Sequence, residues 1–179
     1  MLARVVAVLD EVGIPYMVVG SVASIAYSQP RTTYGIDIVI DPSRDTLLRA
    51  VDAFDPVAYY VDRDAALDAL RRRSSFNLID LQIGWKVDLV IRRARQFSVE
   101  ELRRRRAGVV LGVSTYIASP EDTILAKLEW AKQGGGSEQQ LRDCAAIVGV
   151  QGDALDRAYI ERWIGELGVE AEWAKVKDG

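Results

Sequence analysis

Three short stretches decide the fold of this chain: VVGSVAS at residues 18–24, PRTTYGIDIVI at residues 30–40 and KVDLV at residues 86–90. The first predicts a strand that ends at a Gly-Ser turn and leads into a helix. The second ends in an aliphatic run at residues 36–40 that is interrupted only by Asp37, and the third is an aliphatic run around Asp88, so both predict strands. Because a buried carboxylate is unfavourable unless it is paired or bound to a cation, Asp37 and Asp88 are the first candidate site residues.

Each feature also has a structural interpretation. Alternation along a strand places the isoleucines of residues 36–40 on one face and Asp37 on the other, so Asp37 could face solvent on an edge strand. The same holds for Asp88. A Gly-Ser turn before a helix is ordinary capping when it stands alone, although the N–H groups of a helix N-terminus also suit a phosphate. The occurrence of the turn and both aspartates together, in this order, favours a functional site.

Composition limits the chemistry that this chain can perform. Its 179 residues are 49% hydrophobic, with 23 Lys and Arg against 26 Asp and Glu, so there is no global basic charge to attract nucleic acid. The absence of His removes the commonest general base and zinc ligand. The single Cys144 is expected to be a small core residue. No apolar run approaches the roughly 20 residues of a membrane span, and a cytoplasmic protein without a membrane partner is expected.

The remaining pattern predicts a mixed α/β part followed by helices, with the division near residue 118. Residues 1–118 are expected to form the α/β core and residues 119–179 the helical part. Ser43, Asp62, Ser119 and a capping box at Ser98 and Glu101 are predicted to begin helices. Further strands are predicted at 57–61, 76–83 and 86–91, and further helices at 138–148, 154–167 and 171–176. The helical spacing of Leu2, Val5, Val6 and Leu9 predicts another helix, with Gly13 as its stop.

The pattern resembles the nucleotidyltransferase superfamily, the DNA polymerase beta-like fold, and in particular small bacterial members akin to abortive-infection and toxin–antitoxin nucleotidyltransferases. In that family a Gly-Gly or Gly-Ser turn precedes a helix, Arg-x-Thr-x-Asp-x-Asp follows on one strand, and a third Asp lies on a later strand. The matching residues are Gly20, Ser21, Arg31, Thr33, Asp37 and Asp88. The resemblance covers nearly the whole chain and implies a mixed β-sheet flanked by helices, with a C-terminal helical part.

The resemblance also implies roles for individual residues. Asp37 and Asp88 would be catalytic and would hold Mg²⁺, while Gly20 and Ser21 would bind the triphosphate of an NTP. Arg31 would support that phosphate, or cap the preceding turn. Lys127 resembles a lysine that reaches the nucleotide in the family, although a lysine at the surface or between helices fits the pattern equally well.

One residue departs from the family pattern. Gly35 stands where the first aspartate of the Asp-x-Asp pair is expected, so only two of three metal-binding carboxylates remain. The leading prediction is therefore Mg²⁺-dependent transfer of a nucleoside monophosphate from an NTP to a hydroxyl or phosphate of RNA, such as tRNA, of a protein or of a small molecule. The alternative is a catalytically inactive module that binds nucleotide, RNA or a partner antitoxin in a toxin–antitoxin or phage-defence system. The arginines at 71–73 and 103–106 could contact an RNA backbone or be solvated helix ends.

Overall fold

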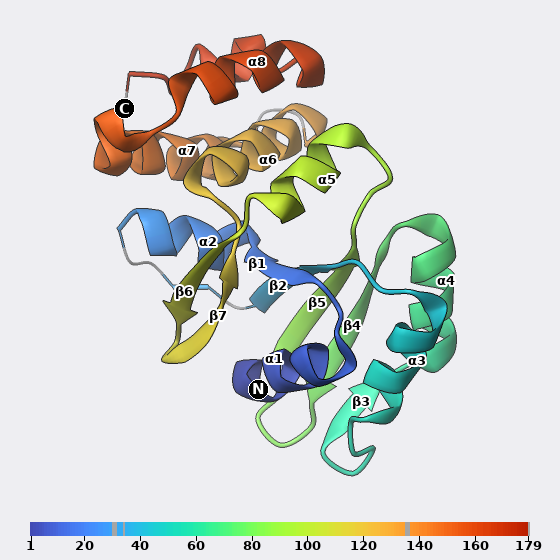
Figure 1. Ribbon diagram of the computed structural model, residues 1–179. Helices are drawn as coiled ribbons and strands as arrows, with labels where there is room; N and C mark the ends of the chain where they lie inside the picture. The colour runs from blue at the N-terminus through green and yellow to red at the C-terminus, as the bar shows by residue number, and fades with distance from the viewer. Residues whose placement is uncertain (30–31, 34, 135–136, 179) are drawn as a thin grey trace. The chain divides into compact units, whose positions relative to one another are not determined.

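The computed structural model describes residues 1–29, 32–33, 35–134 and 137–178, and these form two compact units (Figure 1). Unit 1 comprises Met1–Val19 and Thr32–Ile117, and unit 2 comprises Gly20–Arg31 and Ala118–Gly179. The helix after the Gly-Ser turn therefore belongs to the same unit as the C-terminal helices. The division of the sequence into 1–118 and 119–179 places that helix in the first part instead. That division remains an interpretation of the sequence.

Unit 1 is built on a mixed sheet whose strand order is β3-β4-β5-β2-β1-β7-β6. Strand β2 pairs antiparallel with β1 and parallel with β5, and these three central strands carry the stretches that decided the fold. The strands are β1 Tyr16–Val19, β2 Gly35–Ile40, β3 Tyr59–Val61, β4 Ser75–Asp80, β5 Lys86–Ile91, β6 Arg106–Val110 and β7 Val113–Ile117.

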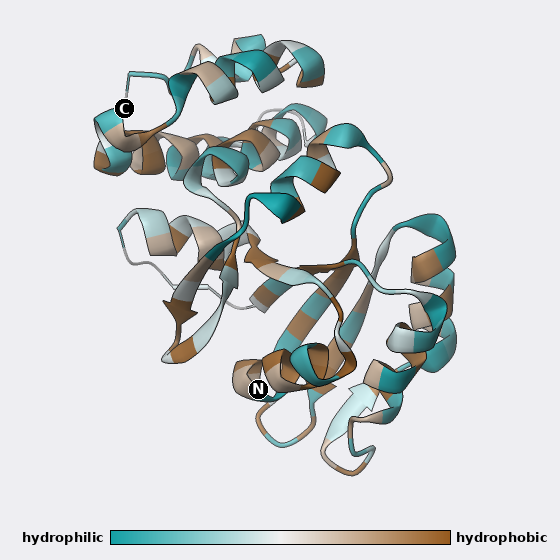
Figure 2. Cartoon of the chain, viewed as in Figure 1, coloured by the Kyte–Doolittle hydropathy of each residue, from teal (hydrophilic) through white to brown (hydrophobic). Residues whose placement is uncertain are grey.

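Alternating burial fixes which face of the sheet forms the core of unit 1. Ile36, Ile38 and Ile40 of β2 are buried, and the residues between them are half-buried; β5 has the same pattern. Alternate bands of apolar and polar residues along β4 and β5 are visible in Figure 2. Helices α1 and α3 share a small apolar cavity with Ile40, Phe76 and Leu89, so they cover this buried face. The opposite face is left to carry the polar residues.

Four helices complete unit 1, and two of the three predicted caps are confirmed there. The helices are α1 Leu2–Val12, α3 Arg44–Asp52, α4 Arg63–Arg72 and α5 Gln96–Arg103. Ser43 forms a capping box with Thr46, and the Asp62 carboxylate accepts a hydrogen bond from the N–H of Ala65. The capping box predicted at Ser98 is wrong. Arg95 takes the N-cap position, and Ser98 is buried within the first turn, where its Oγ lies 3.0 Å from Arg95 Nε.

Two strand predictions also need correction. Strand β3 begins at Tyr59 rather than Val57, because the Asp55 carboxylate accepts the N–H of Val57 and holds that residue in a turn. The β6–β7 hairpin was not predicted. Its first strand begins at the last residue of the arginine run 103–106, and the two strands are joined by a tight turn in which Leu111 and Gly112 both have positive φ.

Unit 2 is helical, and its central helix, α6, begins at a serine N-cap followed by a proline. Ser119 Oγ accepts the N–H of Asp122, and Pro120 occupies the first turn, as predicted. Ile124, Leu125 and Leu128 of this helix are fully buried. The helices are α2 Gly20–Tyr27, α6 Pro120–Gln133, α7 Glu138–Gln151, α8 Arg157–Leu167 and α9 Glu170–Trp173, with a short 3₁₀ turn at Gly152–Ala154. Across the described part of the chain, no helix has the length and apolarity to cross a membrane.

Candidate active site

Asp37 and Asp88 lie side by side on the sheet of unit 1. They are register partners on the parallel strands β2 and β5, so their Cα atoms are about 4.8 Å apart and their side chains leave the same face. Both are half-buried, whereas Ile36, Ile38 and Val87 are buried on the other face. The sequence identified both aspartates but could not show that they are adjacent.

A row of residues crosses this face through the two aspartates. Val19 of β1 pairs with Asp37, and the exposed Asn77 of β4 pairs with Asp88. Because register partners project to the same side, Asn77 supplies an amide next to the carboxylates. Asn77 was not among the predicted site residues, and only the strand register places it here.

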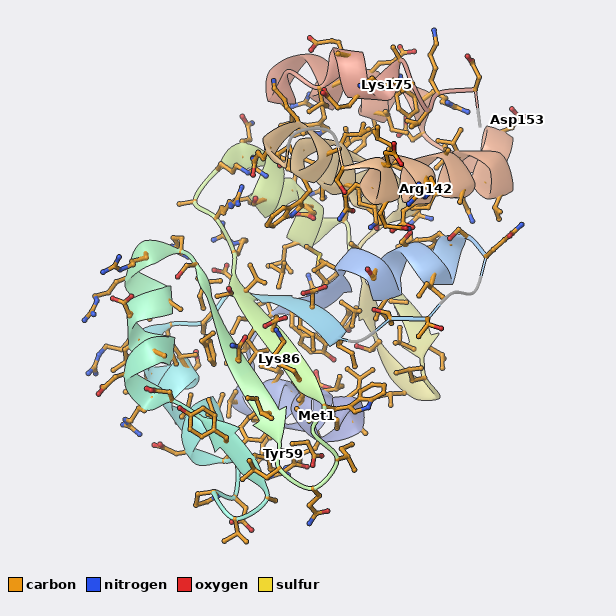
Figure 3. The ribbon with its side chains drawn as sticks, turned by 180° about the vertical axis from the view of Figure 1, so that it is seen from behind. Met1, Tyr59, Lys86, Arg142, Asp153 and Lys175 are labelled. Atoms are coloured by element: carbon orange, nitrogen blue, oxygen red, sulfur yellow. The ribbon has the colours of Figure 1, made fainter. Side chains whose placement is uncertain are left out.

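A lysine forms an ion pair within the same site. The ammonium of Lys86, a residue labelled in Figure 3, lies 3.0 Å from Oδ2 of Asp88, two residues along β5 on the same face. The Lys86 side chain is 46% exposed and the Asp88 side chain 25%. Sequence reasoning missed this residue, although its i, i+2 spacing from a strand aspartate was the available signal.

Gly35 stands beside this lysine. It is the register partner of Lys86 and lies two residues before Asp37, on the same face of β2. A Cβ at position 35 would meet only the backbone oxygen of Lys86 at 3.9 Å, which is an ordinary contact. The backbone therefore has room for a side chain where the family pattern expects a carboxylate.

Two other acids of unit 1 serve structural roles. Asp80 is on the buried side of β4, and its carboxylate accepts the N–H groups of Gln82 and Ile83 in the turn toward β5. Asp41 lies at the end of β2 and is paired with Arg92 at 2.9 Å. Neither replaces the carboxylate that is absent at Gly35.

The metal ligands that this site can offer are two carboxylates. No group of three or more His, Cys, Asp or Glu suited to a metal occurs among residues 1–29, 32–33, 35–134 and 137–178. Mg²⁺ is usually held by one or two carboxylates together with water and substrate phosphates. The adjacent pair of Asp37 and Asp88 fits that pattern when a nucleotide supplies the remaining oxygens.

Gly20 and Ser21 begin helix α2 of unit 2. Gly20 has φ +64°, the left-handed region that side chains disfavour, and this explains a glycine at the turn without any ligand. The first N–H groups of a helix have no partner within the helix, and together with the helix dipole they suit a phosphate. Arg31, the predicted phosphate-supporting residue, lies outside the described residues.

The backbone of Gly20 gives a first testable prediction. Gly20→Ala is expected to lose about 1 kcal/mol of stability in chemical denaturation, because alanine is strained at this φ. Gly20→Asn is the matched control, since asparagine tolerates the left-handed region, and it should lose less. Equal losses for both variants would contradict a purely conformational requirement for glycine.

Lys127 lies between two helices of unit 2. Its ammonium is 2.7 Å from Asp143 Oδ2 of α7 and 2.9 Å from Gln140 Oε1, and the Lys127 and Asp143 side chains are only 5% and 6% exposed. Gln139 donates to the other oxygen of Asp143. This is the helix-pairing arrangement that the sequence left open, and a contact of Lys127 with nucleotide remains a prediction.

Two acidic residues in the first turn of α6 are fully buried. Asp122 is fully buried and accepts the hydroxyls of Ser119 and Tyr159, each at 2.6 Å. Glu121 is also fully buried, and its carboxylate accepts the N–H of Asp156 at 3.2 Å. These acids link α6 to the start of α8. The arrangement is structural, because each of these carboxylates is held by donors from its own unit.

Cys144 is a core residue, as predicted. It is buried in α7, with its Sγ 3.6 Å from the carbonyl oxygen of Ile124. Burial raises the pKa of the Cys144 thiol to about 12, so a thiolate nucleophile is not available at neutral pH.

Comparison with known proteins identifies the scaffold. No protein-family model and no curated protein sequence matches the chain. Among solved structures, ANT(2'')-Ia in complex with adenylyl-2''-tobramycin matches with TM-score 0.62 and 14% identity, over 95% of this chain and 96% of that one. An antigenic nucleotidyltransferase-like protein from Paracoccidioides brasiliensis matches with TM-score 0.57 and 15% identity, over 99% and 90%. This chain has the nucleotidyltransferase fold.

A third structure with similar topology is JHP933 from Helicobacter pylori, with TM-score 0.50 and 15% identity over 97% of this chain and 75% of that one. The predicted fold is thereby confirmed. At identities of 14–15% the matches establish the nucleotidyltransferase fold alone, and the function has to be argued from the residues of the site.

Proposed function

We propose that this chain is a nucleotidyltransferase that transfers a nucleoside monophosphate from an NTP to a hydroxyl or phosphate acceptor with the help of Mg²⁺. The observation that carries the proposal is the register of Asp37 with Asp88 on adjacent parallel strands. Two half-buried carboxylates at this separation repel each other, and a shared cation would relieve that repulsion.

The residues around the two aspartates and at the Gly-Ser turn have proposed roles. Asp37 and Asp88 would hold Mg²⁺, which when bound would neutralise phosphate charge and activate the attacking hydroxyl. The backbone N–H groups at Gly20 and Ser21 would bind phosphate, with Arg31 as an additional donor. Asn77 would donate its amide to a ligand oxygen beside Asp88.

The proposed acceptor carries a hydroxyl or a phosphate. The complex of ANT(2'')-Ia contains an adenylylated tobramycin, which supports a hydroxyl acceptor for the present chain. RNA, a protein or a small molecule can each present such a hydroxyl. The cytoplasmic location and a partner antitoxin remain predictions from the sequence.

The direct test is a titration of each NTP with and without Mg²⁺, followed by thermal unfolding and by intact-mass analysis. A ligand that binds only the native state must raise the melting temperature. We expect one NTP with Mg²⁺ to raise the melting temperature. We also expect the mass of the acceptor to increase by one nucleoside monophosphate. Added tRNA, the protein itself and an aminoglycoside are tested separately as acceptors. No shift with any NTP would overturn the proposal.

A second candidate function is a catalytically inactive module that binds nucleotide, RNA or a partner protein. Gly35 favours it, because the described residues offer two carboxylates where the family pattern has three. The Lys86–Asp88 ion pair favours it as well, since it already neutralises one of the two. Nucleotide binding without transfer to any acceptor would support this candidate over the enzyme.

Position 35 separates the two candidates. Gly35→Asp places a third carboxylate about 6.6 Å along β2 from Asp37, into space that the backbone leaves open. The metal-free melting temperature should fall or stay unchanged, because negative charge is added beside Asp37. The increase caused by Mg²⁺ with NTP should become larger, and transfer activity should rise above that of the parent.

Gly35→Asn is the matched control for that variant, because it adds nearly the same volume without charge. It should leave the response to Mg²⁺ unchanged. The contrary result would be a well-folded Gly35→Asp protein whose response to Mg²⁺ and NTP is no larger than that of the parent. Asp37 and Asp88 would then not form the proposed metal site, and the binding module would be the better description.

A further inference from the structure

The polar face of β2 and β5 contains a cation of its own. Lys86 approaches Asp88 to 3.0 Å, and its register partner on β2 is Gly35, which contributes no side chain. A carboxylate at position 35 would therefore lie directly across from Lys86 on the neighbouring strand. At this pair of register positions the chain has an ammonium and a glycine.

The Lys86 ammonium is placed beside two negative charges on this face of the sheet. Asp37 and Asp88 bring two negative charges to one row, and Lys86 brings one positive charge to the next. The pair of Lys86 and Asp88 is partly shielded from water, with side chains 46% and 25% exposed. A positive charge at 3.0 Å from Asp88 offsets the repulsion between the carboxylates of Asp88 and Asp37, as a bound metal ion would.

A divalent cation bound at Asp88 and the Lys86 ammonium would share one carboxylate. Mg²⁺ binds carboxylate oxygen at 2.0–2.1 Å, and an ammonium held about 3 Å from the same carboxylate would repel it. The ammonium can leave, because the lysine stem is flexible and half-exposed. When the Lys86 ammonium moves away, the ion pair with Asp88 is broken, and the free energy of that ion pair reduces the net affinity for the metal.

We propose that Lys86 is the internal counter-cation of Asp88 and competes with the divalent metal for that carboxylate. The inference rests on the proposed function, because it assigns a regulator of metal affinity to the same site. Lys86 acts through Asp88 as a positioning residue. It holds the Asp88 carboxylate in place without metal, and Mg²⁺ must displace it to bind that carboxylate.

The first measurement is metal affinity in the absence of nucleotide, by calorimetric titration of Mg²⁺ and Mn²⁺ into the parent, Lys86→Met and Lys86→Arg. Lys86→Met keeps most of the stem and removes the charge, and we expect it to bind metal roughly two- to fivefold more tightly, as for a partly exposed ion pair. Lys86→Arg keeps the charge and should bind like the parent. Equal or weaker binding by Lys86→Met would overturn the competition.

The second measurement needs no metal. In buffer containing a chelator, Lys86→Met should lower the melting temperature, because Asp88 then lies beside Asp37 without this ammonium. In the Lys86→Met/Asp88→Asn double variant the two changes should be non-additive, with a melting temperature above the sum of the single effects. Additive effects would overturn the role of Lys86 as counter-cation.

The two measurements separate this inference from the proposed function. Non-additivity in chelator, together with no metal binding by any variant, would overturn the Mg²⁺-dependent function and leave Lys86 as the counter-cation of a metal-free site. Metal binding that is unaffected by Lys86→Met, with additive effects in chelator, would overturn the inference and leave the proposed function standing.

Discussion

Lys127→Met is expected to destabilise unit 2 by about 3–5 kcal/mol, because it leaves the Asp143 carboxylate buried without its cation. Both side chains are almost fully inaccessible, so water cannot compensate for the lost ion pair. Chemical denaturation followed by tryptophan fluorescence measures the loss, since Trp163 is buried in α8 of the same unit.

Two controls make this expectation specific. Replacing both partners, as in Lys127→Met/Asp143→Leu, should recover most of the stability, because it removes the unpaired charge. Arg142→Met breaks an exposed pair with Glu138 on the same helix α7 (labelled in Figure 3), and it should cost no more than about 0.5 kcal/mol.

Lys127→Met also tests the role in nucleotide binding that the family resemblance implies for Lys127. A loss of nucleotide affinity in a Lys127→Met protein of parental stability would indicate a direct contact with nucleotide. A large loss of stability that the double variant reverses, with nucleotide affinity restored at the same time, would indicate that Lys127 only joins α6 to α7.

Asp37→Asn and Asp88→Asn should each reduce nucleotidyl transfer by at least about a hundredfold and abolish the Mg²⁺-induced rise in melting temperature. Each variant removes one of two carboxylate ligands and leaves the shape of the side chain unchanged. The rate is measured at saturating NTP, and metal binding by the thermal shift. Parental activity in either variant would remove that aspartate from the site.

Stability without metal reports on a different interaction in each variant. Asp37→Asn relieves repulsion at Asp88 but also changes the interaction that Asp37 itself makes, so its free energy of unfolding should stay close to that of the parent. Asp88→Asn gains the same relief but loses the ion pair with Lys86, and the two effects should cancel to within about 1 kcal/mol. Asp41→Asn is the control in unit 1, because Asp41 is engaged by Arg92 and should not affect the response to Mg²⁺.

Local signals were sufficient for the elements whose ends are set by a few neighbouring residues. The caps at Ser43, Asp62 and Ser119 were predicted correctly, since each depends on hydrogen bonds within three residues along the chain. Alternation of apolar residues predicted which face of β2 and β5 is buried. These features need no knowledge of distant parts of the chain.

Predictions failed where a more distant or competing interaction decided the structure. Ser98 matched a capping box, but the buried position of this residue and its contact with Arg95 moved the helix start upstream. The β6–β7 hairpin escaped prediction because the arginines at its start resembled the end of a helix. Its strands are stabilised by pairing with each other and with β1, which no local pattern reveals.

The sequence by itself determined that two aspartates lie within strands, that a glycine turn precedes a helix, and that Gly35 takes the place of an expected acid. These are properties of residue type and short spacing. Only the tertiary structure decided that Asp37 and Asp88 are neighbours, that Lys86 pairs with Asp88 beside Gly35, and that Lys127 is buried against Asp143. The physical reason is that strand register and helix packing bring together residues from separate parts of the chain, and the charge that each carboxylate meets depends on those neighbours.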